Sequence, residues 1–162
     1  MKKRMIGNLE VSEVAMGCMG FSHGYGKVPE ESYSIEAIQE AYQFGCTFFD
    51  TAEAYGREMF YEGHNEQIVG KAVKDFRKDV VLATKLHIHN EELNLGETVE
   101  EIIRRHLKKS LENLQTDYVD LYYLHRINEN IEIEEVAKVM GKLIDEGLIK
   151  GWGLSHVGVE IL

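Results

Sequence analysis

Residues 45–56, GCTFFDTAEAYG, contain the pattern that decides the fold. The stretch is mostly apolar up to Phe49. It is followed by two groups that can exchange protons, the carboxylate of Asp50 and the phenol of Tyr55. A short apolar run preceded by a glycine is typical of a buried strand. The sequence therefore predicts a strand over 47–51, with Asp50 at its carboxyl end and Tyr55 just beyond it.

The same arrangement occurs twice more along the chain. The run VVLATK ends in Lys85, and the run VDLYYLHR reaches His125 near its end. In alternating β/α proteins the carboxyl ends of parallel strands meet at one rim, and active sites form there. We therefore expect Asp50, Tyr55, Lys85 and His125 to face one another. A carboxylate, a phenol, an ammonium group and an imidazole together suit proton transfer to a carbonyl oxygen.

The composition places the chain among globular proteins and narrows its partners. Of its 162 residues 44% are hydrophobic, and the mean hydropathy of -0.28 suits a soluble domain with its own core. The formal net charge of -10 argues against a nucleic-acid partner, because such a surface needs clustered basic residues. The densest basic stretch, RRHLKK at 104–109, is interpreted as the solvated face of a helix.

Cysteine usage and targeting signals predict a cytoplasmic protein. Cys18 and Cys46 are too few and too far apart for a disulfide framework, so we expect reduced, packed thiols. The amino terminus, MKKRM, is basic but lacks the apolar run of a signal peptide. No stretch is long and apolar enough to span a membrane, so no membrane partner is expected.

Strand-like and helix-like segments alternate along the chain, which predicts an α/β fold with a parallel sheet covered by helices. A hairpin is expected over 4–13, around the turn at Gly7-Asn8. The expected strands are 14–19, 47–51, 80–85, 118–125 and 150–155, and the expected helices are 29–44, 65–76, 98–114 and 133–146. Thr98 and Glu101 form a capping-box signature at the start of the third helix. No linker or break in composition interrupts the pattern, which favours one domain over 1–162.

These segments resemble the aldo-keto reductase superfamily. Residues 45–56 resemble the second-strand signature of that family, and NEQIVGKA at 65–72 resembles the helix that follows it. ATK at 83–85 and DLYYLHR at 120–126 resemble the strands that carry the lysine and the histidine, in the same order. GWGLS at 151–155 resembles the fifth strand.

The resemblance implies a (β/α)8 TIM barrel whose bottom is closed by an amino-terminal hairpin. It spans the chain but covers only about the first half of a typical member of the family. We therefore expect a partial aldo-keto reductase domain over 1–162, an incomplete barrel with four βα units, a fifth strand and the hairpin, and with the C-terminal half absent. Open barrel edges favour self-association.

The resemblance also implies an NADPH-dependent oxidoreductase that reduces small aldehydes or ketones to alcohols. Tyr55 would donate the proton, and Lys85, held by Asp50, would stabilise the phenolate. His125 would orient and polarise the carbonyl. No side chain can supply a hydride, so the chemistry requires a nicotinamide cofactor. Because half of the barrel is absent, we expect no measurable turnover from the isolated 162-residue chain.

Cofactor contacts are expected from Asp50, Ser155 and His156. In the family the fifth-strand serine contacts the nicotinamide carboxamide, and Ser155 occupies that position. The residue after the serine is usually asparagine, and this chain departs from the family there with His156. The choice of NADPH over NADH follows from the family alone. The substrate is not named by the sequence, although Tyr25, Phe60 and Tyr61 are candidates either to line the pocket or to pack within loops.

Two other interpretations remain open. A chain of the same lineage can be a catalytically incompetent fragment or a regulatory nicotinamide-binding subunit. Alternatively, His87 and His89 lie at alternate positions and, with His125, suggest a metal-dependent hydrolase on a barrel fold. No carboxylate completes that ligand set at a suggestive spacing, so we expect no metal. The glycine-rich loop at 20–26 lacks a phosphate-binding spacing and is interpreted as a loop over the site.

Overall fold

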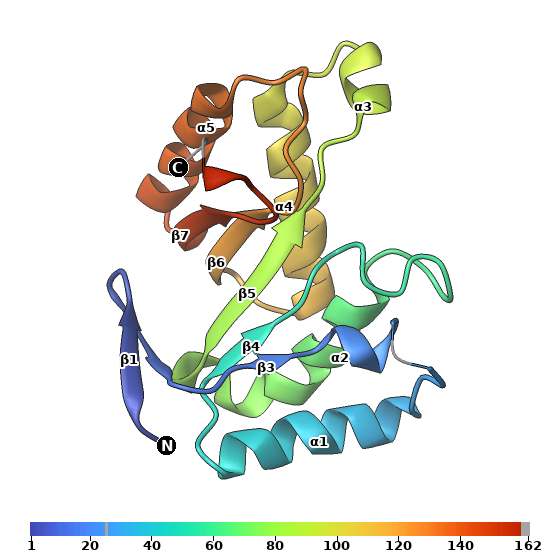
Figure 1. Ribbon diagram of the computed structural model, residues 1–162, viewed down its shortest axis with the longest axis vertical. Helices are drawn as coiled ribbons and strands as arrows, with labels where there is room; N and C mark the ends of the chain where they lie inside the picture. The colour runs from blue at the N-terminus through green and yellow to red at the C-terminus, as the bar shows by residue number, and fades with distance from the viewer. Residues whose placement is uncertain (25, 160–162) are drawn as a thin grey trace.

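The computed structural model describes residues 1–24 and 26–159, and its centre is a parallel sheet with strand order β3-β4-β5-β6-β7 (Figure 1). The strands are β3 (Met16–Gly17), β4 (Phe48–Asp50), β5 (Val81–Leu86), β6 (Val119–Leu124) and β7 (Ile149–Leu154). A separate antiparallel hairpin precedes them, formed by β1 (Lys3–Ile6) and β2 (Leu9–Ser12). The predicted hairpin and the predicted strand order are therefore present.

Helices follow the strands and cover one face of the sheet. The long helices are α1 (Glu31–Gln43), α2 (His64–Val73), α4 (Val99–Leu114) and α5 (Ile133–Asp145), and the short ones are η1 (Met19–Phe21), η2 (Lys74–Asp79) and α3 (Asn90–Asn94). Neighbouring helices contact one another in chain order, α1 with α2, α2 with α4, and α4 with α5 (Figure 1). The result is an α/β fold in which each parallel strand is linked to the next by a helical crossover.

The two faces of the sheet carry different residues, because side chains along a strand alternate between faces. On the helix side, Leu82, Leu86 and Tyr122 belong to the main core. The opposite face has a small apolar cluster that includes Val81 and Ala83, and the hairpin packs against it near the amino end of β5. Position 85 continues the alternation of 81 and 83, so Lys85 belongs to the same face at the carboxyl end.

The capping box predicted for the third helix is present. The Thr98 hydroxyl accepts the Glu101 N–H at 3.3 Å, and the Glu101 carboxylate accepts the Thr98 N–H at 2.8 Å. These bonds satisfy two of the helix-end N–H groups that have no partner within the helix. Helix α4 therefore begins where the sequence predicts, and it ends at Leu114 as expected.

The first strand is shorter than predicted. A strand was expected over 14–19, but β3 covers only Met16–Gly17. The Cys18 carbonyl accepts the Phe21 N–H at 3.0 Å and the Asn65 side chain at 2.9 Å, which turns the chain into η1. The second predicted helix also ends early, because Phe76 has non-helical angles and residues 74–79 form η2. Helix α3 was not predicted.

The interpretation of 104–109 as a solvated helix face is wrong at two positions. His106 and Leu107 are buried, at 8% and 1% exposure. They lie on the same side of α4 as Ile102 and Ile103, which face the core. The two arginines of the run, by contrast, are paired with glutamates, Arg104 with Glu146 and Arg105 with Glu97 among others. Among the helices of the described residues, none has the length and apolarity needed to cross a membrane.

Candidate active site

Lys85 connects the residues at the carboxyl ends of β4 and β5. Its ammonium group donates to Asp50 Oδ1 at 2.5 Å, to the Thr51 carbonyl at 2.7 Å and to the Tyr55 hydroxyl at 3.2 Å. The Lys85 side chain is 10% exposed and that of Asp50 is 31% exposed. A partly buried ammonium group is therefore neutralised on one side by a carboxylate, while its third hydrogen bond reaches the phenol.

Strand pairing brings these side chains together. Asp50 lies opposite Ala83 in the register of β4 and β5, and the chain beyond β4 continues to pair, because the Glu53 N–H donates to the Lys85 carbonyl. The loop is held from the other side by Asn65, which bonds the Thr51 hydroxyl at 2.6 Å and the Cys18 carbonyl at 2.9 Å. The segment that carries Tyr55 is thus fixed at both ends.

His125 completes the group from the end of β6. The centroid of its ring lies 5.7 Å from that of the Tyr55 ring, in an edge-to-face arrangement. The backbone N–H of His125 donates to the Leu86 carbonyl. Burial, together with the positive charges of Lys85, Arg126 and His87, lowers the pKa of His125 to about 4. The imidazole is therefore neutral at pH 7, so it can donate or accept a hydrogen bond without adding charge. The four residues predicted from the sequence lie together.

A cleft of about 490 Å³ opens above this group. It is lined by Met19, His23, Ala54, Tyr55, Arg57, Glu58, Lys85, His125, Arg126, Ser155 and His156. Three of the predicted catalytic residues and both predicted residues that follow β7 belong to this lining. The cleft lies where the carboxyl ends of the parallel strands meet, as expected for a site in an α/β protein.

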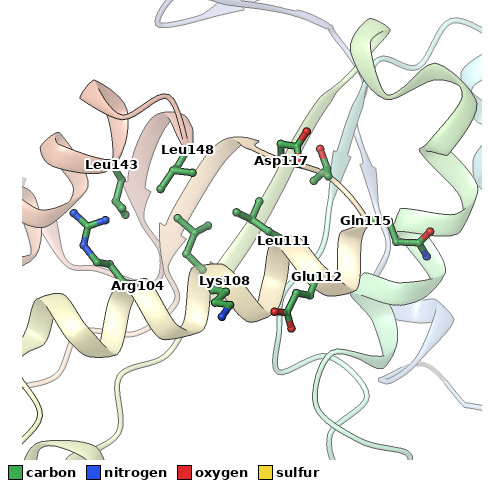
Figure 2. A pocket seen from close by; sticks show the side chains of 10 residues that line it. Arg104, Lys108, Leu111, Glu112, Gln115, Asp117, Leu143 and Leu148 are labelled. Atoms are coloured by element: carbon green, nitrogen blue, oxygen red, sulfur yellow. The ribbon is translucent and has the colours of Figure 1, made fainter.

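A larger cavity, of about 720 Å³, lies elsewhere (Figure 2). It is a groove between α4, α5 and the start of β7, and Leu111, Leu143 and Leu148 line it. It contains no histidine, tyrosine or cysteine, and none of the site residues predicted from the sequence borders it. By size alone this groove would be the candidate active site. The smaller cleft is the better candidate, because it is lined by side chains that can transfer protons.

Ser155 and His156 follow β7 and border the cleft. The Ser155 N–H donates to the Leu124 carbonyl at 3.0 Å, which continues the pairing of β7 with β6. His156 has a φ of 57°, in the left-handed region that asparagine enters more readily than most residues. Neither side chain bonds another described residue, so both have hydrogen-bonding groups available to a ligand.

Two of the residues suggested for the substrate pocket, Phe60 and Tyr61, are not part of the cleft lining. Phe60 stacks on the His64 ring at 4.0 Å, and Tyr61 meets the same ring edge-on at 5.2 Å. Their interpretation as loop packing therefore fits the structure better than a place in the cleft lining. Tyr25, the third candidate, lies outside the described residues.

The histidines considered as metal ligands lie next to each other. The rings of His87 and His89 are 4.3 Å apart, and His87 also contributes charge near His125. Within residues 1–24 and 26–159, no three histidine, cysteine, aspartate or glutamate side chains are grouped so that they could hold a metal ion. The two cysteines are free and buried, and burial raises the pKa of the Cys18 thiol well above its usual range.

The structure also shows a buried ionic cluster that the sequence did not reveal. His106 lies between two carboxylates, with Nδ1 at 2.7 Å from Glu53 and Nε2 at 2.7 Å from Glu92. The other carboxylate oxygen of Glu53 accepts the backbone N–H of His87 at 2.7 Å, and that of Glu92 accepts the backbone N–H of His89 at 2.8 Å. This His106 clamp joins the loop after β4 to the segment after β5. Glu53 lies inside the deciding stretch, but its partner is far along the chain and no local signal identifies it.

A sequence profile described as the Aldo/keto reductase family matches residues 13–162. The chain belongs to this family. The aldo-keto reductase YhdN of Bacillus subtilis is 39% identical over 160 residues, which cover 94% of this chain and 45% of that protein. The probable aldo-keto reductase 1 of Glycine max is 36% identical over 157 residues, which cover 94% of this chain and 44% of that protein.

Solved structures of aldo-keto reductases are similar in fold. The holo form of the Bacillus halodurans aldo-keto reductase AKR11C1 has a TM-score of 0.78 and 34% identity, and the match covers 96% of this chain and 50% of that one. The Klebsiella pneumoniae aldo/keto reductase in complex with NADP and acetate has a TM-score of 0.75 and 31% identity, and the match covers 93% of this chain and 48% of that one. The prediction of an incomplete (β/α)8 barrel of the aldo-keto reductase type is confirmed.

The chain spans about half the length of the curated relatives it matches. The predicted Tyr55, Lys85 and His125 line one cleft, and Asp50 is bonded to Lys85 beside it.

Proposed function

We propose that this chain carries the catalytic residues of an NADPH-dependent oxidoreductase that reduces a small aldehyde or ketone to an alcohol. The observation that carries the proposal is the position of Lys85, whose ammonium group bonds both Asp50 and the Tyr55 hydroxyl at the bottom of an open cleft. A buried lysine with one carboxylate partner needs no phenol to satisfy its charge. Its third bond instead prepares the phenol to release a proton.

Tyr55 is the proton donor in this proposal. As the carbonyl oxygen becomes an alkoxide it takes the phenol proton, and the phenolate left behind accepts a hydrogen bond from the Lys85 ammonium group. Asp50 forms an ion pair with that ammonium group and holds it in place. His125, neutral at pH 7, donates a hydrogen bond to the carbonyl oxygen and fixes its position beside the phenol.

The cofactor supplies the hydride when it is bound. Ser155 and His156, which line the cleft together with Tyr55, and Asp50, which bonds Lys85, would hold its nicotinamide end. The choice of NADPH is supported by two solved relatives from Klebsiella pneumoniae, which are complexes with NADP and with NADPH. These relatives are each 31% identical to this chain, so the cofactor is inferred from kinship rather than from residues that select the 2′-phosphate.

Other predictions belong to the same proposal. We propose that residues 1–162 form one part of a single domain, that the protein acts in the cytoplasm, and that exposed strand edges favour self-association. We assign no role to a metal ion in the reaction. The alternative of an inactive fragment or a regulatory nicotinamide-binding subunit is separated from the enzyme by the test below.

The test replaces Tyr55 by phenylalanine in the full-length protein. The change removes only a hydroxyl, so NADPH affinity should stay within about twofold while carbonyl reduction falls on the order of 10²–10⁴-fold, the usual contribution of a positioned acid. NADPH oxidation with 4-nitrobenzaldehyde, followed by absorbance, measures the rate. Tyr33→Phe is the matched control, because Tyr33 is 62% exposed on α1 and outside the cleft.

The outcomes separate the interpretations. A Tyr55→Phe variant that keeps more than a tenth of the wild-type rate removes Tyr55 from the role of proton donor. A wild-type protein that binds NADPH but reduces no aldehyde favours the regulatory subunit. A protein that neither binds NADPH nor reduces an aldehyde favours the inactive fragment.

A further inference from the structure

The cleft is positively charged, although the chain as a whole carries a formal net charge of -10. Among its described lining residues, Arg57, Lys85 and Arg126 are cations and only Glu58 is a carboxylate. The charge of Lys85 is offset by Asp50. The excess positive charge therefore comes from the two arginines.

Neither arginine is neutralised by a partner in the described part of the chain. No carboxylate of residues 1–24 or 26–159 lies within ion-pair distance of Arg57 or Arg126, and Glu58 is no exception. The Arg126 guanidinium bonds only the carbonyl of its neighbour, His125. By contrast, Arg77, Arg104 and Arg105 each pair with at least one acid.

The two arginines flank the residues that act on the carbonyl. Arg57 lies two positions after Tyr55, and Arg126 lies directly after His125. Within the cleft, burial and then Lys85 lower the pKa of His125, and the charge of Arg126 adds to this lowering. The arginines therefore provide a positive rim around Tyr55 and His125, the residues that would receive the carbonyl.

We propose that Arg57 and Arg126 bind a carboxylate on the substrate, so that this site selects aldehydes or ketones that carry an acid group. The inference rests on the proposed function, because it assumes that the carbonyl lies at Tyr55 and His125. A guanidinium group presents paired N–H donors that match the two oxygens of a carboxylate. A cleft with an excess of positive charge also raises the local concentration of anionic ligands.

A matched pair of substrates isolates the charge. 4-Carboxybenzaldehyde carries a carboxylate, and methyl 4-formylbenzoate has the same ring and aldehyde with a neutral ester. The wild-type full-length protein should favour the acid in kcat/KM by about tenfold, since two exposed ion pairs together contribute on that scale. The preference should shrink when salt is raised to about 0.5 M, because exposed charges are screened.

The variant Arg57→Gln with Arg126→Gln should lower the acid-to-ester ratio of kcat/KM about tenfold, towards one. The ratio is used because it cancels any general loss of activity. The matched control is Arg4→Gln with Lys138→Gln, which removes the same charge from exposed residues outside the cleft and should leave the ratio unchanged. A fluorescence titration with NADPH is the second measurement, since cofactor phosphates are the other source of anionic groups.

Each result decides the inference. A wild-type ratio near one, or a preference for the acid that survives in the double variant, overturns it. A double variant that loses NADPH affinity but keeps the ratio also overturns it and assigns the arginines to the cofactor. If neither aldehyde is reduced, the proposed function fails, and NMR titration with benzoate and methyl benzoate decides the inference by itself. Binding of benzoate that weakens about tenfold in the double variant supports it, and equal binding overturns it.

Discussion

Two ionic clusters in this molecule use similar residues in opposite ways. In the cleft, Lys85 bonds Asp50 and Tyr55, and the phenol and the neighbouring imidazole face open space. In the His106 clamp, both ring nitrogens and both carboxylates are occupied, and the His106 and Glu53 side chains are 8% and 7% exposed. A cluster with all its hydrogen-bonding groups satisfied holds a fold together, whereas one with groups left over can act on a ligand.

The two histidines show the contrast most directly. Burial and nearby cations lower the pKa of His125 to about 4. Burial also acts to lower the pKa of His106, but the hydrogen bonds and charges of Glu53 and Glu92 outweigh it and raise the value to about 9. His125 is therefore neutral at pH 7 and His106 is charged. The same side chain serves as a neutral hydrogen-bonding group in one place and as a buried cation in the other.

The clamp is also connected to the cleft. Glu53 lies two residues before Tyr55, and its N–H donates to the Lys85 carbonyl. His87, whose N–H binds the Glu53 carboxylate, lies two residues after Lys85. The satisfied cluster thus holds the two segments from which the reactive side chains extend. The comparison predicts that changes in the clamp reduce stability most and that changes in the cleft reduce rate most.

The largest effect on stability is expected from His106→Leu. The change leaves the buried Glu53 without its cation and Glu92 with Arg105 alone, and breaking a buried ionic group of this kind costs about 3–5 kcal/mol. Urea unfolding followed by circular dichroism measures the free energy of unfolding. Lys109→Leu is the control, because Lys109 is exposed on the same helix and should change stability by less than about 0.5 kcal/mol. If the two variants lowered the free energy of unfolding equally, the His106 clamp would not be a major source of stability.

A smaller free-energy effect, seen in rate, is expected from Lys85→Met. The change removes the cation that bonds the Tyr55 hydroxyl, and turnover should fall about 10²-fold or more, about 2.7 kcal/mol. Lys85→Arg should keep residual activity with a shifted pH profile of kcat. The control Lys78→Met replaces an exposed lysine outside the cleft. Full activity with an unshifted profile in Lys85→Arg would make Lys85 a structural residue only.

The cleft cluster could be predicted from the sequence because its geometry is local to strand ends. Asp50, Lys85 and His125 each end an apolar run, and parallel pairing brings such ends together without further information. The cationic rim had a signal too, since Arg57 and Arg126 lie next to residues already predicted. It was missed because exposed arginines are common, and only the structure shows that these two have no acidic partner among residues 1–24 and 26–159.

The clamp could not be predicted in the same way. His106 lies within a basic run, and its inward orientation depends on how α4 packs against the segments after β4 and β5. The short strand β3 was missed for a related reason. Side chains distant in sequence, such as Asn65 at the Cys18 carbonyl, decide where the backbone turns.

The smallest expected effect concerns the pH dependence of stability. The pKa of His106 is raised from an ordinary 6.5 to about 9 by Glu53 and Glu92. A raised pKa in the folded state stabilises the protein fully below pH 6.5, and this stabilisation is lost as pH rises through 9. Between pH 7 and pH 10 the free energy of unfolding should therefore fall by about 2 kcal/mol more in the wild type than in His106→Gln. The difference between the two proteins cancels the titration of other groups. If the free energy of unfolding fell equally in both proteins, His106 would not be the charged centre of the clamp. The two histidines would then differ in burial and not in charge.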